Sequence, residues 1–181
     1  MFLVPGVLSQ AEAARFVETA EARGFEHQGS RGPKYGEAFR DNHRLSFQDP
    51  KLAEHLWSGT GLAEAFRGCS EFDSEEAVGL NSNLRVYRYS AGQRFGRHID
   101  QRVELGQGGR HTRYTLLIYL SSARGGETVF YGGRGRKVAS VAPEPGLALF
   151  HRHGDECLEH EGAQVVAGVK YVLRSDVVFR D

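Results

Sequence analysis

Apolar residues recur at helical spacing close to the start of the chain, from Ala13 to Ala20. Such a repeat predicts a helix that buries one face. Ser9 and Glu12 precede it in a capping-box pattern, in which each side chain satisfies a backbone N–H of the other residue. Gly24 is the expected end, because glycine readily adopts the conformation that terminates helices.

A second helical start is indicated by Asp49 followed by Pro50, since aspartate caps helices and proline is favoured in the first turn. Residues 62–66 predict one or two further helical turns. The intervening stretch 29–36 is rich in glycine and charge and is expected to be a loop. We therefore expect residues 1–79 to be mostly helical and to support the remainder of the chain.

After residue 80, short runs of β-branched, leucine and aromatic residues alternate with glycines, a pattern typical of all-β domains. The run 114–120 is almost wholly apolar, as in a strand buried on both faces. The predicted strands are 84–89, 95–99, 114–120, 128–131, 137–141, 148–151, 158–160 and 170–179. About eight such strands predict a mainly β fold, a jelly roll over residues 80–181 whose mouth is a natural ligand site.

The bulk composition fits one folded domain spanning 1–181, because 40% of the 181 residues are hydrophobic. The formal net charge is zero, which argues against a nucleic-acid binder with a clear basic excess. Several arginines nevertheless lie close together in sequence, and we expect solvated loop charges in preference to a binding rim. They are Arg94, Arg97, Arg102, Arg110 and Arg113.

The two cysteines, Cys69 and Cys157, are too few for a disulfide scaffold and are expected to be reduced thiols. The N-terminus lacks a basic region, and Pro5 interrupts its short apolar run. No stretch is long enough to span a membrane. These features predict a cytoplasmic protein without a membrane partner.

His98 and Asp100 lie two residues apart, so on a strand both side chains point to the same side. They can share one metal ion with a histidine from a later strand, for which His151, His153 and His160 are available. Two histidines and one carboxylate on one face leave three positions open, the arrangement of non-heme Fe(II) oxygenases. Lys170 is then a candidate to hold the carboxylate of a co-substrate.

Further sequence motifs occur between residues 89 and 170. Tyr89–Asp100 contains a tyrosine, a glycine, an aromatic residue and the HxD pair. Thr115–Leu120 reads T-x-x-x-Y-L, and Gly125–Phe130 reads GGET-x-F. Gly146–Phe150 is an apolar strand, and His160–Lys170 contains H-x-G and V-x-x-G-x-K. Together these blocks resemble the prolyl 4-hydroxylase-like family of the 2-oxoglutarate- and Fe(II)-dependent dioxygenases.

The resemblance implies a double-stranded β-helix with His98, Asp100 and His160 as ligands of Fe(II). It favours His160 over the other two histidines, because only His160 has the following glycine and the lysine at the family spacing. It also implies that Lys170 pairs with the distal carboxylate of 2-oxoglutarate. Dioxygen is the second co-substrate, and ascorbate is an expected accessory reductant.

The resemblance points to Tyr89 and Thr128 as hydroxyl donors to the same carboxylate, and Tyr119 is a further hydroxyl candidate. Arg174 shares a strand face with Lys170 if the strand is regular, and is either a second carboxylate or substrate contact or a structural salt bridge. Arg113 is a candidate for substrate binding, although the local register is offset by one residue from the family arginine.

Other residues near these motifs have simpler interpretations. His151 and His153 are expected to be loop or strand-end histidines, and Cys157 a core thiol, because a soft thiolate does not belong to this ligand set. Residues 40–44 are expected to form a solvated loop. The polar, glycine-rich segment Leu105–His111 is long for a hairpin and is expected to form a mobile lid beside the metal.

The sequence thus predicts a dioxygenase that hydroxylates an aliphatic C–H of a protein or peptide residue, such as a prolyl residue. The released products are succinate and CO2. One alternative is hydroxylation of a free amino acid or small metabolite. Another, from a different class, is a non-catalytic jelly-roll binding module with a vestigial metal site.

Overall fold

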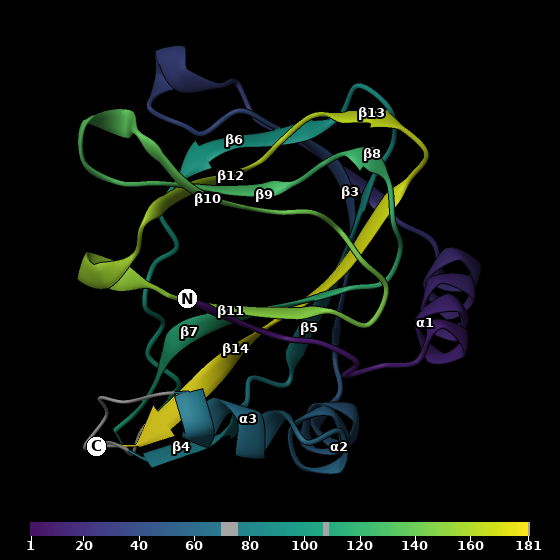
Figure 1. Cartoon of the computed structure of the whole chain (residues 1–181), viewed down its shortest axis with the longest axis vertical. Helices are drawn as coiled ribbons and strands as arrows, with labels where there is room; N and C mark the ends of the chain where they lie inside the picture. The colour runs from purple at the N-terminus through teal and green to yellow at the C-terminus, as the bar shows by residue number, and fades with distance from the viewer. Residues whose placement is uncertain (70–75, 107–108, 181) are drawn as a thin grey trace.

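The computed structural model describes residues 1–69, 76–106 and 109–180 (Figure 1). The helices are α1 (Gln10–Arg23), α2 (Pro50–Gly59) and α3 (Leu62–Cys69). The strands are β1 (Phe2–Val4), β2 (Glu26–Gly29), β3 (Arg40–Gln48), β4 (Glu76–Leu80), β5 (Asn83–Tyr89), β6 (Arg94–His98), β7 (Arg110–Tyr119), β8 (Arg124–Gly125), β9 (Thr128–Tyr131), β10 (Lys137–Val141), β11 (Ala148–Arg152), β12 (Glu159–Gly162), β13 (Val165–Ala167) and β14 (Lys170–Arg180).

The helix ends follow the capping signals of the sequence. The hydroxyl of Ser9 accepts a hydrogen bond from the backbone N–H of Glu12, and the glutamate carboxylate accepts one from the N–H of Ser9 in return. Gly24 ends α1 with a φ of 85°, a conformation that favours glycine. The carboxylate of Asp49 caps α2 by accepting from the N–H of Leu52 at 2.9 Å. The capping box and both helix starts are therefore confirmed.

Twelve of the described strands form one sheet that curls over itself, and Figure 1 shows the two resulting layers; β8 and β13 form a separate pair. The order along the sheet is β1-β11-β7-β14-β5-β3-β6-β12-β9-β10. The lower layer contains β11, β7, β14 and β5, and the upper layer contains β6, β12, β9 and β10. The antiparallel double-layered sheet confirms the predicted jelly-roll fold class.

The two faces of the lower layer have different surroundings. The outer face packs against the helices in an apolar core that includes Leu56, Phe66 and Leu116. The inner face and the upper layer enclose a smaller cluster that includes Tyr119 and Phe130. Alternation along each strand decides which face a residue joins, so the inner face is where polar side chains can approach a ligand.

The first third of the chain contains more strand than expected. Residues 40–44 belong to β3, which pairs with β5, β6 and β2, so the prediction of a solvated loop there is wrong. Asn42 is fully buried even though β3 begins with five polar residues. Backbone pairing on both sides holds this polar start of the strand in the sheet, whereas Leu45 and Phe47 farther along β3 pack against the core. The short strands β1, β2, β4, β8 and β13 also carry too little pattern to be recognised.

Candidate metal and co-substrate site

A cavity lies between the two layers of the sheet, with a volume of about 440 Å³ that includes its open mouth. One end contains the imidazoles of His98 and His160 beside Asp100. Lys170 lies on another part of the lining. Tyr87, Leu117 and Val172 contribute further wall surface. All polar residues of the predicted site except Tyr119 therefore line one shared space.

The structure brings His98, Asp100 and His160 together, as the sequence predicts. His98 ends β6 and is the direct cross-strand partner of His160 on β12. The Nε2 of His98 lies 3.6 Å from Oδ1 of Asp100, and the Nε2 of His160 lies 3.7 Å from Oδ2. One donor atom from each residue falls within 4.8 Å of the other two. This arrangement has the size and ligand types of a divalent-metal site.

Hydrogen bonds orient both histidine rings toward that position. The Nδ1 of His98 lies 2.8 Å from the carbonyl oxygen of Gly96, and the Nδ1 of His160 lies 2.9 Å from that of Leu158. A carbonyl only accepts, so each Nδ1 carries the proton and each Nε2 presents a lone pair to Asp100. Outer hydrogen bonds of this kind are the usual way in which metal-binding histidines are fixed.

Burial keeps the imidazoles in the neutral form that metal binding needs. Burial, and next the neighbouring His160, lowers the pKa of His98 to about 4. Burial also lowers the pKa of His160. Both rings are therefore uncharged at neutral pH and available as ligands.

Asp100 stays ionised because basic groups surround it. Burial alone would raise its pKa, but the guanidinium of Arg174 and the nearby imidazoles hold the pKa well below its usual range. The Nη2 of Arg174 lies 3.1 Å from Oδ2 of Asp100, and Nη1 donates to Oδ1 at 3.2 Å. The hydroxyl of Thr115 donates to Oδ2 at 2.7 Å. These contacts hold the carboxylate in a fixed orientation.

Arg174 also lies 3.5 Å from Asp176, which in turn pairs with Arg85. The sequence leaves two roles open for Arg174, a ligand contact and a structural salt bridge. Its contacts with the described residues are those of a structural salt bridge. Its acidic partner, Asp100, is itself a candidate metal ligand. The arginine therefore acts on the site from within the protein.

Lys170 differs from Arg174 in having no carboxylate partner among the described residues. Only 4% of its surface is exposed, and the residue lines the cavity. Its Nζ lies 5.3 Å from the ring centroid of Tyr89 and 5.6 Å from that of Tyr119. Burial lowers the pKa of Lys170 to about 8, and Glu127 only partly offsets this. A buried cation without an anion is costly, so this end of the cavity suits an external anion.

The predicted hydroxyl residues lie close to Lys170. Tyr89 is the cross-strand partner of Lys170, and its ring forms part of the cavity lining. The hydroxyl of Tyr119 donates to the hydroxyl of Thr128 at 2.7 Å. Burial raises the pKa of both tyrosines, so both remain neutral donors. Their role toward a ligand remains a prediction.

His151 is the main residue of this region that the sequence interpretation misses. It lies in β11 opposite Thr115, and its Nε2 is 3.6 Å from Oδ2 of Asp100. Its ring centroid is 4.4 Å from that of His160. The sequence places His151 two residues after Leu149, on the same strand face. Strand alternation thus shows that His151 and Leu149 share a face of the strand. It does not show that this face lies toward Asp100.

Several other predicted features lie away from the cavity. The guanidinium of Arg113 stacks at 5.5 Å from the ring centroid of Phe179, and Arg113 does not line the cavity. Leu105 and Arg110 are hydrogen-bonded in a hairpin, and no described residue of the predicted lid 105–111 lines the cavity. Residues 107 and 108 of that segment lie outside the described residues.

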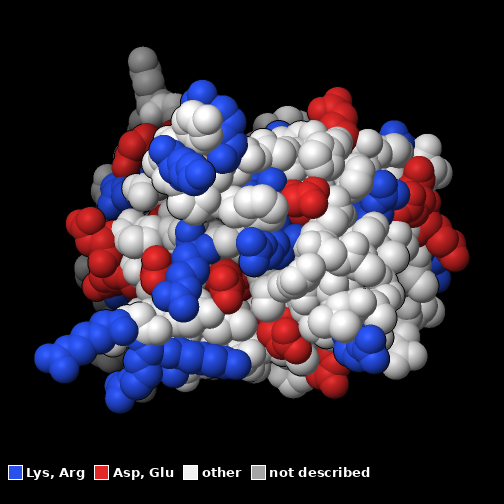
Figure 2. Space-filling view, turned by 90° about the horizontal axis from the view of Figure 1, so that it is seen from above, with Lys and Arg blue, Asp and Glu red and all other residues white. Residues whose placement is uncertain are grey.

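The charged surface gives no support to a continuous basic rim. Figure 2 shows lysine and arginine side chains intermingled with acidic ones on the face above the upper layer. Arg97 pairs with Glu159 at 3.5 Å, and Arg102 pairs with Glu104 at 2.7 Å. Among the described residues, no helix combines the length and the apolar character needed to cross a membrane.

Comparison with known proteins agrees with this geometry. The family model of the 2OG-Fe(II) oxygenase superfamily matches residues 84–175. A viral collagen prolyl hydroxylase from Paramecium bursaria Chlorella virus-1, in complex with 2OG, is 19% identical with a TM-score of 0.68, covering 99% of this chain and 96% of that chain. A Pseudomonas putida prolyl-4-hydroxylase is 17% identical with a TM-score of 0.65, covering 99% and 91%.

A third similar structure is a Trichoplax adhaerens prolyl hydroxylase in complex with a hypoxia inducible factor peptide fragment. It is 16% identical with a TM-score of 0.69, covering 97% of this chain and 82% of that chain. At such identities the solved structures establish a shared fold. A search of curated proteins finds no match to this chain.

Proposed function

Because the chain belongs to the 2OG-Fe(II) oxygenase superfamily, we propose that it hydroxylates an aliphatic C–H of a protein or peptide residue, such as proline. The protein is an oxygenase enzyme that uses Fe(II) and 2-oxoglutarate. In the proposed reaction, the substrate, 2-oxoglutarate and dioxygen give the hydroxylated substrate, succinate and CO2. One oxygen atom enters the substrate and the other enters succinate.

The observation that carries the proposal is the buried side chain of Lys170, which has no carboxylate partner among the described residues and lines the same cavity as the metal-ligand candidates. A dicarboxylate can bridge these two parts of the cavity. The Lys170 ammonium would neutralise the distal carboxylate, and the 2-oxo acid end would reach the metal. A structural metal site would have no need of a separate desolvated cation, because burying an unpaired charge is unfavourable.

The ligand set fits Fe(II). His98 and His160 present neutral imidazole lone pairs, and Asp100 presents a charged oxygen, so three protein ligands would leave three positions open. Bound Fe(II) supplies the oxygen activation that couples oxidative decarboxylation of 2-oxoglutarate to C–H hydroxylation. The protein holds the co-substrate at Lys170, orients Asp100 through Arg174 and Thr115, and limits water in the cavity.

The peptide substrate class is supported by the neighbouring structures, two of which are named collagen prolyl hydroxylase and prolyl-4-hydroxylase, and a third of which holds a peptide. The cavity opens to the surface, and its wall is largely apolar beyond the polar cluster. Such a wall suits an aliphatic side chain more than a highly charged metabolite. A prolyl ring is an uncharged aliphatic group of this kind.

The proposal is tested by incubating the full chain with Fe(II), ascorbate, 2-oxoglutarate and a proline-rich peptide. We expect succinate release and a peptide that gains the mass of one oxygen atom. Free proline is the matched small-molecule substrate, and His160→Ala is the inactive control. Oxidation of free proline but not of the peptide would overturn the substrate class. Absence of both 2-oxoglutarate binding and succinate formation in the wild type would overturn catalysis itself and favour a binding module.

A further inference from the structure

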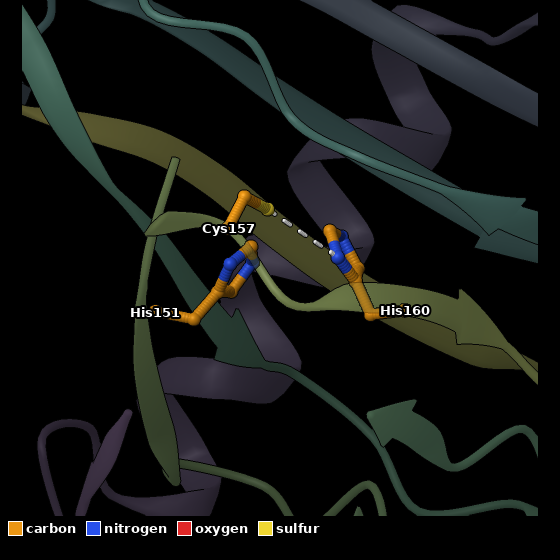
Figure 3. A group of neighbouring side chains, drawn as sticks. All are labelled: His151, Cys157 and His160. Atoms are coloured by element: carbon orange, nitrogen blue, oxygen red, sulfur yellow. Dashed lines mark hydrogen bonds between the residues drawn. The ribbon is translucent and has the colours of Figure 1, made fainter. Parts of the chain in front are cut away.

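Three donor side chains converge at a second cluster that shares one residue, His160, with the candidate iron site. Figure 3 shows His151, Cys157 and His160 pointing toward one another. They come from β11, from the end of the short helical turn 154–156, and from β12. One nitrogen or sulfur atom of each lies within 4.8 Å of the others, and all three residues are buried.

His151 provides a second, independent sign that a ligand fits here. Its Nε2 is buried and has no hydrogen-bond partner among the described residues. Its Nδ1 faces the carbonyl oxygen of Arg152 at 3.2 Å and therefore carries the proton. The lone pair of Nε2 then lacks a hydrogen-bond donor, although only 3% of the residue is exposed; the nearest recorded charged atom is Oδ2 of Asp100 at 3.6 Å. Buried acceptors normally find a partner, and a cation would supply one.

The sulfur of Cys157 completes a donor set of a different character from the candidate iron site. Its Sγ lies 3.9 Å from Nδ1 of His160, whereas Nε2 of that ring faces the carboxylate of Asp100. The sulfur also accepts a hydrogen bond from the backbone N–H of Asp100 at 3.4 Å. Two imidazoles and a thiolate are typical ligands of zinc, whereas Fe(II) in oxygenases takes oxygen and nitrogen ligands. We propose that His151, Cys157 and His160 form a second site for a thiophilic divalent cation of the zinc class.

The geometry requires a modest contraction. Zinc–sulfur and zinc–nitrogen bonds of about 2.3 and 2.1 Å place tetrahedral ligand atoms about 3.4–3.7 Å apart. The three donors, now within 4.8 Å, would close by up to about 1.4 Å. Water would complete the coordination, and the thiol proton would pass to the buffer on binding.

Sharing of His160 makes the two sites alternatives. A neutral imidazole has only one nitrogen lone pair. In the present structure, Nε2 of His160 faces Asp100 and Nδ1 donates to Leu158. A cation at Cys157 would need the lone pair on Nδ1, so Nε2 would become protonated and could not bind iron. Occupancy of the second site therefore removes one ligand from the candidate iron site.

Metal binding at the second site does not depend on the proposed oxygenation. Only the prediction that a cation there prevents iron binding rests on the proposed iron ligands. We would titrate the full chain anaerobically with Co²⁺, which reports thiolate ligation through a sulfur-to-cobalt charge-transfer band. The variant His98→Ala isolates the second site. We expect it to bind one equivalent of Co²⁺ with the thiolate band, and Zn²⁺ to displace the Co²⁺.

Matched thiol variants make the assignment specific. Cys157→Ser should abolish the band and weaken Zn²⁺ binding at least tenfold, while Cys69→Ser, which changes the exposed cysteine, should alter neither. His151→Gln should also weaken Zn²⁺ binding. The same cysteine comparison in the otherwise wild-type chain covers the case that His98→Ala does not fold, which circular dichroism would reveal. A band that persists in Cys157→Ser, or Zn²⁺ affinity unchanged in both Cys157→Ser and His151→Gln, would overturn the site.

Competition tests the exclusion separately. Fe(II) with 2-oxoglutarate should weaken Zn²⁺ binding to the wild type but not to His98→Ala. Equal Zn²⁺ affinity of the wild type with and without Fe(II) and 2-oxoglutarate would overturn the exclusion. Because none of these measurements depends on turnover, failure of the proposed reaction would leave them interpretable.

Discussion

Lys170, which is buried, and Arg174, which is partly buried, are two cations on the same face of β14, four residues apart, with opposite surroundings. Arg174 contacts the carboxylates of Asp100 and Asp176. Lys170 has no acidic contact among the described residues and faces the cavity between aromatic rings. One cation is neutralised by the protein, and the other is left for a ligand. The contrast separates a residue that builds the site from a residue that binds within it.

The chemistry of each side chain suits its place. The planar guanidinium offers several donors to the fixed carboxylate of Asp100. The ammonium is a compact charge on a flexible stem, and its pKa shifts readily on burial. Replacement of each cation by methionine should therefore affect different properties of the protein.

The largest expected effect is on stability. Arg174→Met leaves Asp100 and Asp176 buried beside fewer positive charges, which should lower the free energy of unfolding by about 3–5 kcal/mol. Lys170→Met should leave it unchanged or raise it, because an unpaired buried charge is removed. Denaturant unfolding of the metal-free variants measures both. Equal destabilisation by the two substitutions would remove the distinction.

The next effect is on co-substrate affinity. Lys170→Met should weaken binding of 2-oxoglutarate to the Mn²⁺-loaded protein by about 2–4 kcal/mol, roughly 30- to 1000-fold, because a buried carboxylate loses its cation. Lys137→Met, at an exposed position of β10, is the matched control and should bind normally. Calorimetric titration gives the comparison. Unchanged affinity in Lys170→Met would show that another group holds the carboxylate.

The lowered pKa of Lys170 predicts a pH dependence. In the ligand-free protein the ammonium loses its proton near pH 8, whereas a bound carboxylate would stabilise the charged form. Affinity for 2-oxoglutarate should be steady below pH 8 and then fall by up to about tenfold per pH unit, about 1.4 kcal/mol. Lys170→Met should lack this fall. Titrations across that pH range test the claim.

Stability should change in the opposite direction over the same range. The folded pKa of about 8 lies below the unfolded value of 10.5, so between them the unfolded chain binds more protons. The unfolding free energy of the wild type relative to Lys170→Met should therefore rise from about pH 8 upward. A difference that falls or stays level would contradict the assigned burial of the charge.

The smallest effect concerns the hydroxyl pair beside Lys170. Thr128→Val removes the acceptor of the Tyr119 hydroxyl and should weaken 2-oxoglutarate binding by about 0.5–1.5 kcal/mol. Tyr119→Phe removes the donor while keeping the ring, and it separates a direct contact of Thr128 from a contact through Tyr119. If neither variant changes the affinity, the pair serves packing alone.

The sequence predicts the common face of Lys170 and Arg174 because strand alternation is local and regular. The capped starts of α1 and α2 are local in the same way. His98 and Asp100 do meet as predicted, but β6 ends at His98, so contacts with Thr115 and Arg174 orient Asp100. Local rules do not predict β3, whose polar residues are held by pairing with strands distant in sequence. Nor do they predict that Arg174 meets Asp100, 74 residues away, or that His151 faces the same carboxylate. These contacts depend on how the sheet curls.

We propose that the metal-ligand candidates His98, Asp100 and His160 bind one end of a 2-oxoglutarate molecule through the metal, and that Lys170 binds the other end. The most direct test is a crystal structure of the protein with Mn²⁺ and 2-oxoglutarate, with the metal located by anomalous scattering. We expect a single strong peak among His98, Asp100 and His160, with the distal carboxylate of 2-oxoglutarate on Nζ of Lys170. A peak elsewhere, or a distal carboxylate bound to Arg174 in place of Lys170, would contradict it.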